Sequence, residues 1–518
     1  AILNPFLMVP ESQTKGASLH IIDTSASMEQ HIDQMLDDVT SNLAQQNSII
    51  IANERPHVII QDATAKQARQ TVSTIHLTET GTHLVEAVQL ARSLSPENTV
   101  IHVYSDFIDT TDMATQLEIA LSQLQINNNV VLIHSYAHQG NNIAFIDAQI
   151  SERNLSLLVK NYGNNPVTVP IVHQNQKRSI DIGANDIVRV TFEAPQRSST
   201  FTLQHSDEMS SDNVYYFASL PDTKIPLLYV HNEPNPYLQT ALSLLSFIDV
   251  SSYSPPGVSE ADHYMAFVFE NIELSKMLPG TVTKALQSVE KGGIMVVKMS
   301  ESMRRFDAQG SLPVTDIQSP SQTVVQLLDT PYTQGLSALS HETAYPATPT
   351  DDATVLMQTQ NGDAVIAVRS HGKGLIVYYG IDDNHPNAEF KLSFAYPIMY
   401  KRLMEQALSY PTLSDVNRRT GEIRSGKGTI TLPDGNKQAL PVSLDATGHY
   451  TEQYTIAANL LNFDESSLTS SFSGIAQGRL EQSFEEEMVK KGLLMLIALI
   501  AIALIILEIV MLKWRQEL

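Results

Sequence analysis

Five side chains that could bind a cation through oxygen atoms lie next to the predicted strands and helices of an α/β domain. An Asp-x-Ser-x-Ser run, Asp23–Ser27, directly follows an apolar segment; Thr82 precedes a helical pattern, and Asp106 follows a second apolar segment. Hydroxyl and carboxylate oxygens are the ligands that Mg²⁺, Mn²⁺ and Ca²⁺ prefer in proteins. The alternative is a serine-rich turn in which Ser25 or Ser27 caps the following helix. We predict a divalent-cation site, most simply for Mg²⁺, formed by Asp23, Ser25, Ser27, Thr82 and Asp106.

The elements that must position these residues are predicted from hydrophobic periodicity. Apolar runs typical of strands occupy 18–22, 57–60, 100–104 and 130–134, and between them apolar residues recur at helical spacing in 28–43, 84–91 and 113–124. This alternation is typical of a parallel sheet wrapped by helices, which we predict for residues 17–138. Open sheets of this kind place their sites at the carboxyl ends of the strands. The three loops that carry the five residues are therefore expected to converge.

This constellation resembles the metal-ion-dependent adhesion site of von Willebrand factor A domains. Asp23, Ser25 and Ser27 stand in the Asp-x-Ser-x-Ser motif, Thr82 in the threonine position and Asp106 in the last acidic position. The resemblance implies that the hydroxyls contact the cation and that the aspartates contribute directly or through water. It also implies an open sixth position for a carboxylate from a partner protein. Phe107 departs from the family, in which many relatives have glycine, and we expect it to narrow the mouth of the site.

Length and composition exclude several function classes. The chain has 518 residues, enough for several domains, and its 56 acidic and 33 basic residues give a net charge of −23, which disfavours nucleic-acid binding. It has no cysteine, so disulfides, thiolate metal sites and cysteine nucleophiles are excluded. The sixteen histidines show no metal-ligand spacing, and we predict ordinary surface or core positions for them.

Two further domains are predicted after the first. Strand-like alternation and turn clusters over 140–220 favour a β-sandwich. Residues 224–410 return to alternating strands and helices in an order that resembles the class I glutamine amidotransferase-like fold. That enzyme family needs a cysteine nucleophile, and neither a cysteine nor a Gly-x-Ser-x-Gly replacement is present. We therefore predict a binding or structural role for this Rossmann-like domain, and no enzymatic activity.

A small β domain with a polar linker is predicted over 411–478. Within it, 421–428 is a near miss to a phosphate-binding loop, but Gly428 stands where Ser or Thr must reach Mg²⁺. A strand, 429–432, and a turn follow instead of a helix, so we predict a hairpin.

An apolar run near the end of the sequence predicts one transmembrane helix, over 490–513. The run from Gly492 to Leu512 is interrupted only by Glu508 and is long enough to cross a bilayer; a buried core helix is the alternative. Basic residues flank both ends of the run, so charge does not set its orientation. The sequence opens at Ala1, and we expect the stub over 1–16 to begin either with the end of an earlier hydrophobic helix or with a mature terminus left by signal cleavage.

The predicted fold class is therefore multidomain α/β plus β: a doubly wound von Willebrand A-type domain, a β-sandwich, a second α/β domain, a small β domain and a single C-terminal transmembrane helix. This order resembles Bat-type membrane proteins. The resemblance implies a folded part in the periplasm or outside the cell and a MoxR-type AAA+ ATPase as a working partner in protein assembly or maturation. Two hypotheses follow: a membrane-anchored scaffold that binds acidic side chains of protein partners through its cation, or a surface adhesin or receptor that binds an external ligand there.

Overall fold

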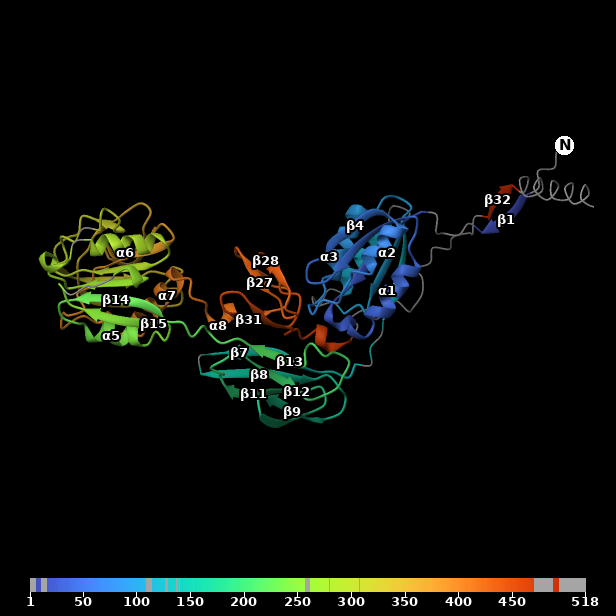
Figure 1. Cartoon of the computed structure of the whole chain (residues 1–518), viewed down its shortest axis with the longest axis horizontal. Coiled ribbons are helices and arrows are strands. Elements are labelled where there is room, and N and C mark those ends of the chain that lie inside the picture. The colour runs from blue at the N-terminus through green and yellow to red at the C-terminus, as the bar shows by residue number, and fades with distance from the viewer. Residues whose placement is uncertain are drawn as a thin grey trace, which may run out of the picture. The chain divides into compact units, whose positions relative to one another are not determined.

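The computed structural model describes residues 6–10, 16–108, 114–125, 129–136, 138, 140–151, 153–256, 261–278, 280–306, 308–469 and 488–492. They form a mixed α/β and β structure in two compact units, Ala1–Ala218 with Asn417–Leu518, and Ser219–Val416 (Figure 1). The second unit begins and ends inside the sequence of the first, and α8 (Leu413–Val416) belongs to it, so the unit ends beyond the predicted boundary at 410.

The predicted transmembrane segment falls largely outside the described residues. Residues 493–513 are not among them, and β32 (Met488–Gly492) pairs antiparallel with β1 (Phe6–Pro10). In the part of the chain that the structure describes, none of the helices has both the length and the apolar character needed to cross a bilayer.

The first domain is built on a five-stranded sheet in the order β4-β3-β2-β5-β6. Its strands are β2 (Ala17–Asp23), β3 (Gln46–Ala52), β4 (His57–Thr64), β5 (Val100–Ser105) and β6 (Val130–Ser135). All neighbours pair in parallel except β4, which runs antiparallel to β3 because the short connection 53–56 permits only a reversal. The sequence prediction missed β3 and expected a wholly parallel sheet.

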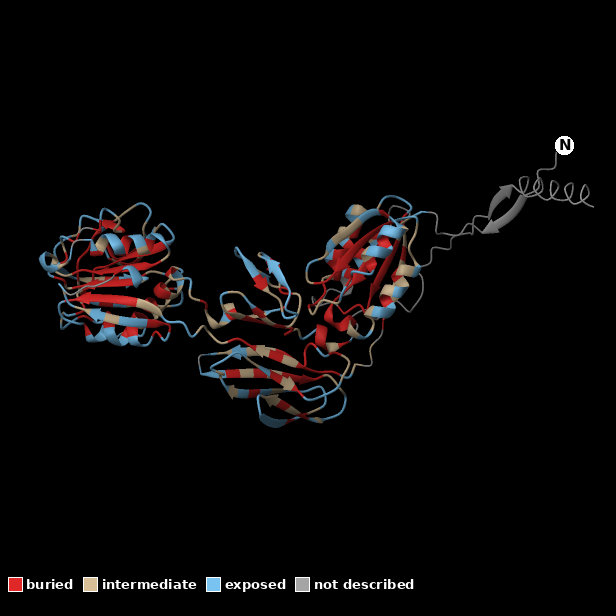
Figure 2. Ribbon diagram, in the orientation of Figure 1, coloured by how far each residue is buried: buried red, intermediate tan, exposed pale blue. Residues whose placement is uncertain are grey.

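Helices cover both faces of this sheet. They are α1 (Ile32–Ser41), α2 (Ala65–Val72), α3 (Leu84–Leu94) and α4 (Ala114–Leu124). Along β2, Leu19 and Ile21 pack with α3 and α4, whereas Ile22 packs with α1 and α2, as expected for side chains that alternate between faces. Figure 2 shows the resulting buried strands. Since Ile22 is in register with Tyr104, the carboxyl ends of β2 and β5 lie side by side.

A sandwich and a small β module complete the first unit. The sandwich has sheets β10-β9-β12-β13 and β11-β8-β7, formed by β7 (Ile143–Ile150), β8 (Asn154–Asn161), β9 (Val167–His173), β10 (Gln176–Ile182), β11 (Ile187–Glu193), β12 (Ser199–Leu203) and β13 (Val214–Phe217). The module contains the sheet β25-β31-β30-β27-β28, formed by β25 (Asn417–Arg419), β27 (Thr429–Thr431), β28 (Lys437–Ala439), β30 (Gly448–Thr451) and β31 (Thr455–Asn459). The hairpin prediction is confirmed, because β27 pairs antiparallel with β28.

The module is joined to the sandwich by side chains that imitate backbone pairing. Asn417 accepts a hydrogen bond from the amide of Ala218 (2.8 Å) and donates one to its carbonyl (2.9 Å). Asn459 does the same for Tyr216, at 2.6 and 2.9 Å. The chain therefore leaves the first unit and re-enters it at neighbouring points.

The second unit contains one nine-stranded sheet, β15-β14-β16-β17-β24-β23-β22-β19-β20. The first five, β15 (Ile248–Tyr253), β14 (Ile225–His231), β16 (Ala266–Glu270), β17 (Ile294–Lys298) and β24 (Gly374–Tyr379), are parallel. The others, β23 (Ala364–His371), β22 (Thr354–Thr359), β19 (Ser321–Leu327) and β20 (Leu339–Ala344), extend it antiparallel. The helices include α5 (Pro236–Ser243), α6 (Thr281–Glu290) and α7 (Ala395–Ala407). Hydrophobic patterns predict strands at 226–230, 265–269, 294–297 and 375–379, which correspond to β14, β16, β17 and β24. They also predict helices at 237–247, 282–289 and 394–407, which correspond to α5, α6 and α7. They do not predict β15 or the four antiparallel strands.

Candidate metal centre

The five predicted ligands lie in buried positions at one end of the first domain. Asp23 ends β2, Asp106 directly follows β5, and Thr82 lies two residues before α3. Each of the five side chains is at most 1% exposed, an unusual environment for hydroxyls and carboxylates. The loop before α3 that carries Thr82, the threonine loop, contacts the serine motif, Asp23–Ser27. The amide of Ala26 donates a hydrogen bond to the carbonyl of Thr80 at 2.9 Å.

Asp23 is the centre of the local hydrogen-bond network. One carboxylate oxygen accepts from the amide of Ser25 (2.9 Å), and the other accepts from the hydroxyl of Ser105 (2.5 Å), which arrives from the neighbouring strand. The hydroxyl oxygens of Ser25 and Ser27 are 3.2 Å apart. Ser25 precedes a short 3₁₀ helix, η2 (Ala26–Gln30), yet its side chain makes no capping hydrogen bond, so capping does not account for this serine.

The two aspartates influence one another electrostatically. Burial and then the negative charge of Asp106 raise the pKa of Asp23 to about 7, although hydrogen bonds from Ser105 and Ser25 oppose the shift. Among the described residues, no lysine or arginine forms an ion pair with either carboxylate. In the described part of the chain the site therefore concentrates negative charge without a lysine or arginine to balance it, which is the environment that a bound cation stabilises.

His138 is a site residue that sequence reasoning missed. Its Nε2 lies 2.9 Å from Asp106 Oδ2, and its Nδ1 lies 3.3 Å from Glu208 Oε2 of the sandwich. Burial lowers the pKa of His138, but the hydrogen bond and charge of Asp106, together with Glu208, outweigh burial and raise it. No motif or spacing in the sequence marks this histidine, for which only a surface or core position was predicted.

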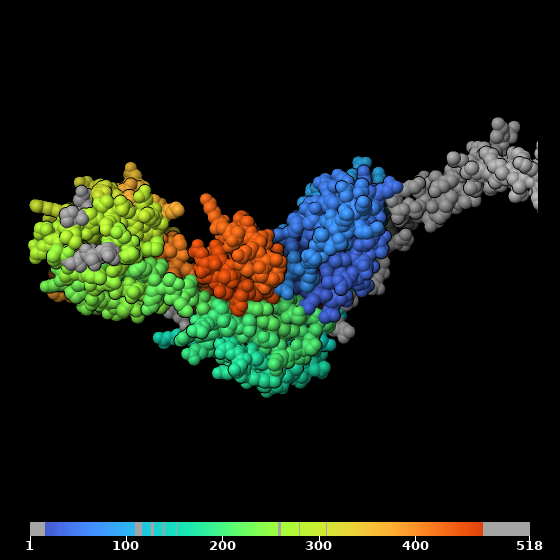
Figure 3. Space-filling model, in the orientation of Figure 1, coloured from blue at the N-terminus to red at the C-terminus, as the bar shows by residue number. Residues whose placement is uncertain are grey.

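Glu465 is a second missed residue. It begins η7 (Glu465–Ser467), after the last strand of the module, and is 0% exposed. Its Oε1 accepts a hydrogen bond from the amide of Ser27 at 2.9 Å. Burial, followed by the charges of Asp106 and Asp23, raises its pKa well above the usual range of a glutamate. In Figure 3 the orange module abuts the blue first domain and the green sandwich, consistent with these contacts.

Phe107 does not narrow the mouth of the site as predicted. Its side chain is 1% exposed and packs in the hydrophobic core with Leu19 and Ile21 of β2. Its φ of 59° lies in the left-handed region, where glycine is favoured, and this explains why glycine suits the position.

The donor set fits a hard divalent cation. Among the described residues, no three histidine, aspartate or glutamate side chains converge closely enough to hold a metal on their own. A cation here consequently needs the hydroxyl oxygens of Ser25, Ser27 and Thr82, with Asp23 and Asp106 supplying charge directly or through water.

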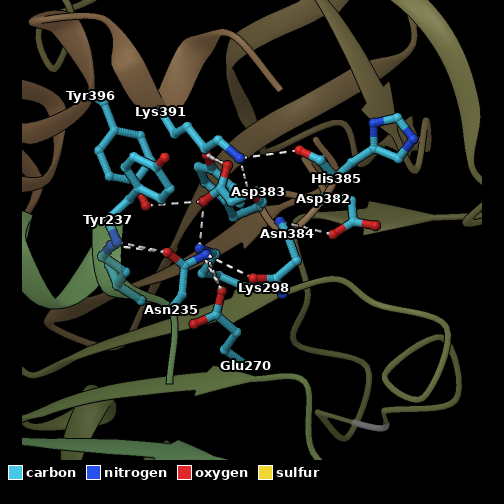
Figure 4. Close-up of polar contacts among 12 residues, drawn as sticks. Asn235, Tyr237, Glu270, Lys298, Asp382, Asp383, Asn384, His385, Lys391 and Tyr396 are labelled. Atoms are coloured by element: carbon cyan, nitrogen blue, oxygen red, sulfur yellow. Dashed lines mark hydrogen bonds and ion pairs between the residues drawn. The ribbon is translucent and has the colours of Figure 1, made fainter. Parts of the chain in front are cut away.

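The second unit has a different buried network, at the carboxyl ends of its parallel strands (Figure 4). Lys298 Nζ lies 2.7 Å from Glu270 Oε1 and 2.6 Å from Asp383 Oδ2. Asp383 also accepts from the hydroxyls of Tyr379 (2.8 Å) and Tyr396 (3.0 Å). Burial lowers the pKa of Lys298, but the charges of Asp383 and Glu270 outweigh burial and raise it well above the usual value. The lysine is thus held as an ammonium ion, whereas nucleophilic catalysis requires a neutral amine.

Comparison with known proteins gives two family matches. A family described as a domain of unknown function, DUF7408, matches residues 226–403, and another, DUF7407, matches residues 143–216. No curated protein matches the chain at a significant level.

Several solved structures share a low similarity with the chain. The cytoplasmic protein STM1381 of Salmonella typhimurium LT2 is 15% identical, over 35% of this chain and 98% of its own, with a TM-score of 0.29. PurLQS from Thermotoga maritima is 12% identical, over 35% and 99%, with a TM-score of 0.27. Three N-terminal domains of the type V pili tip protein Mfa5 from Porphyromonas gingivalis are 8% identical, over 72% and 93%, with a TM-score of 0.19. TM-scores this low carry no argument about function.

Proposed function

We propose that this chain is a divalent-cation-dependent protein-binding scaffold. Its cation site consists of Asp23, Ser25, Ser27, Thr82 and Asp106, in a doubly wound domain of the von Willebrand A type. Segment 490–513 anchors the chain in a membrane, and the scaffold serves an assembly or maturation system with a MoxR-type AAA+ ATPase. The observation that supports the proposal is the burial of two carboxylates, Asp23 and Asp106, that influence one another electrostatically beside the serine hydroxyls, without an ion pair to lysine or arginine in the described residues.

The chemistry of these ligands favours an acidic partner. A cation held largely by neutral hydroxyls keeps much of its positive charge, and an incoming carboxylate then gains a charge-assisted contact that an amide cannot match. The net charge of −23 does not prevent this, because surface charges beyond a Debye length of about 8 Å are largely screened.

Calorimetric titration of the purified chain with Mn²⁺ and Mg²⁺ tests the proposal. We expect saturable binding by the wild type and its loss in Asp23→Ala. Asp33→Ala, which removes an exposed carboxylate from α1 of the same domain, is the matched control and should bind as the wild type does. Equal affinity of wild type and Asp23→Ala would refute the proposed site.

A further inference from the structure

The segment that carries Glu465 lies against the cation motif. Leu460, directly after β31, packs with Ala26 of η2 and with Met209 of the sandwich. The carbonyl of Ser466 accepts a hydrogen bond from Asn142 at 2.9 Å. Contacts from two other parts of the unit thus hold η7 beside the serine motif.

One oxygen of Glu465 has no hydrogen-bond partner among the residues that the structure describes. Oε1 is used by the amide of Ser27, but Oε2 is fully buried and forms no hydrogen bond within the described part of the chain. An unsatisfied buried carboxylate oxygen is costly, and this one adds to a region where Asp23 and Asp106 already lie. His138 touches Asp106, and its single charge cannot balance three carboxylates. A divalent cation would satisfy this oxygen and offset the excess charge.

The module also holds the threonine loop. The carboxylate of Glu79, three residues before Thr82, accepts hydrogen bonds from the amide and the hydroxyl of Thr447, the latter at 2.7 Å. The amide of Glu79 donates to the carbonyl of Asp445 at 2.7 Å. The module is therefore connected both to the loop of Thr82 and to the motif of Ser27.

We propose that Glu465 is the chain's own carboxylate ligand for this cation. The inference rests on the proposed cation site and specifies how that site is regulated. Glu465 takes the position that an acidic side chain of a partner would take, so the partner binds only when η7 withdraws. A ligand carried on the same chain has an effective concentration in the millimolar range or above, so a weak acidic ligand does not displace it. The module thus acts as a built-in competitor.

A local set of hydrogen bonds positions the turn that would have to withdraw. Asn462 Oδ1 accepts from the amides of Asp464 and Glu465 at 3.1 and 3.2 Å, and it organises the turn that presents the glutamate. Together with the bonds of Ser27 and Asn142, these contacts define the closed position of η7. A partner that binds the uncovered cation more tightly than Glu465 does shifts the equilibrium toward the open form.

The test uses Mn²⁺ as the probe metal and a short glutamate-containing peptide as the probe carboxylate. Glu465→Gln keeps the size of the side chain and its acceptor for Ser27 but removes the charge, and Glu465→Ala removes the ligand altogether. Asp464→Asn, at the exposed neighbouring position, is the matched control. Calorimetry gives the affinity for Mn²⁺, and water proton relaxation reports how many exchangeable waters the bound Mn²⁺ carries.

We expect both Glu465 variants to bind Mn²⁺ about tenfold more weakly or worse, with higher water relaxation and with new binding of the acidic peptide. Asp464→Asn should match the wild type, which takes up Mn²⁺ but little peptide. Asn462→Ala keeps every carboxylate of the site and loosens only the turn, so it should also gain peptide binding. This variant keeps the test valid if substitution of Glu465 disturbs folding.

The failure of the inference and the failure of the proposed function have different signatures. Unchanged affinity, relaxation and peptide binding in all three variants, with Mn²⁺ still lost in Asp23→Ala, would overturn the role of Glu465 and leave the cation site standing. An absence of Mn²⁺ binding by the wild type and by every variant would overturn both.

Discussion

The side chain of Glu465 accepts a hydrogen bond from the backbone amide of Ser27, 438 positions earlier in the chain. Ser27 is the last residue of the motif that the sequence marks most clearly, and Glu465 lies near the end of the folded part that the structure describes. The contact therefore joins a predicted cation ligand to a residue that no motif identifies, and it connects the serine motif to the module.

Removal of divalent cations should destabilise the first domain. A ligand that binds only the folded state at a hundred times its Kd stabilises that state by about 2.7 kcal/mol. We expect a chelator to increase hydrogen exchange in β2 and β5 of the wild type, and excess Mg²⁺ to reverse the change. Asp106→Asn, measured by the same mass-spectrometric exchange, should respond to neither addition. Identical responses of the two proteins would argue against cation binding at Asp106.

The buried histidines of the first domain should make it sensitive to mild acid. His20, His102 and His134 stack with Tyr104 on β2, β5 and β6. Burial lowers the pKa of His20 to about 4, with His134 adding to the shift and Asn47 opposing it; burial and the other two histidines lower that of His102 to about 3. Both rings therefore stay neutral in the folded domain where the unfolded chain, with histidine pKa values near 6.5, takes up protons.

The free energy of unfolding should consequently fall as the pH drops from about 6.5 to about 4, and the His20 contribution should level off below that. The loss of unfolding free energy that His20 contributes over this pH interval is about 3 kcal/mol. His20→Asn should flatten this dependence, whatever it does to stability at neutral pH, whereas exposed His57→Asn should keep the wild-type slope. Pulsed hydrogen-exchange labelling of β2 gives the urea midpoint of unfolding at each pH, and the change of this midpoint with pH measures the slope. Parallel curves for the two variants would contradict the assignment.

Loss of the Lys298 ammonium should strongly destabilise the second unit. Lys298→Met leaves Glu270 and Asp383 buried without their cation, and breaking such a pair typically costs about 3–5 kcal/mol. Lys284→Met removes the exposed ion pair with Asp262 and should cost less than about 1 kcal/mol. Urea unfolding, monitored by hydrogen exchange in β16, β17 and β24, compares the stability of the two variants. Similar losses in the two variants would mean that the buried network contributes little.

The second unit should release no ammonia from glutamine. The chain contains no cysteine to attack the amide, and Lys298 is held in its charged form. Incubation of the purified chain with glutamine and an assay for ammonia measure this directly, with heat-killed protein as the blank. Release above the blank would reveal a nucleophile other than a thiolate.

Much of the first domain could be predicted because local patterns and tertiary structure agree there. The runs around Ile21 and Val103 are largely apolar and are buried on both faces, as strands covered by helices on both sides are. β3 was missed because its apolar run, Ile49–Ala52, is short and begins after polar residues. The antiparallel strands of the second unit were missed for a related reason: β19 and β20 are rich in polar residues such as Ser, Thr and Gln, and their pairing with each other is not visible in the hydrophobic pattern.

The candidate site was predictable only where its residues are close in sequence or follow a known order. Asp23, Ser25 and Ser27 share one turn, and the chain order of Thr82 and Asp106 matches a family pattern. His138 and Glu465 reach the site through long-range packing, and neither type nor spacing distinguishes them from other histidines and glutamates. Prediction of such residues requires the relative placement of the domain and the module, which a single sequence does not contain.

The insertion of the second unit between Ala218 and Asn417, which are hydrogen-bonded to each other, also determines the order of events during synthesis. A ribosome makes all five predicted ligands before it begins the second unit, but it reaches Glu465 only after that unit and most of the module have been made. At 5–20 residues per second, the residues from 107 to 464 take roughly 20 to 70 seconds. The nascent first domain therefore passes through an interval in which the motif exists and its covering segment does not.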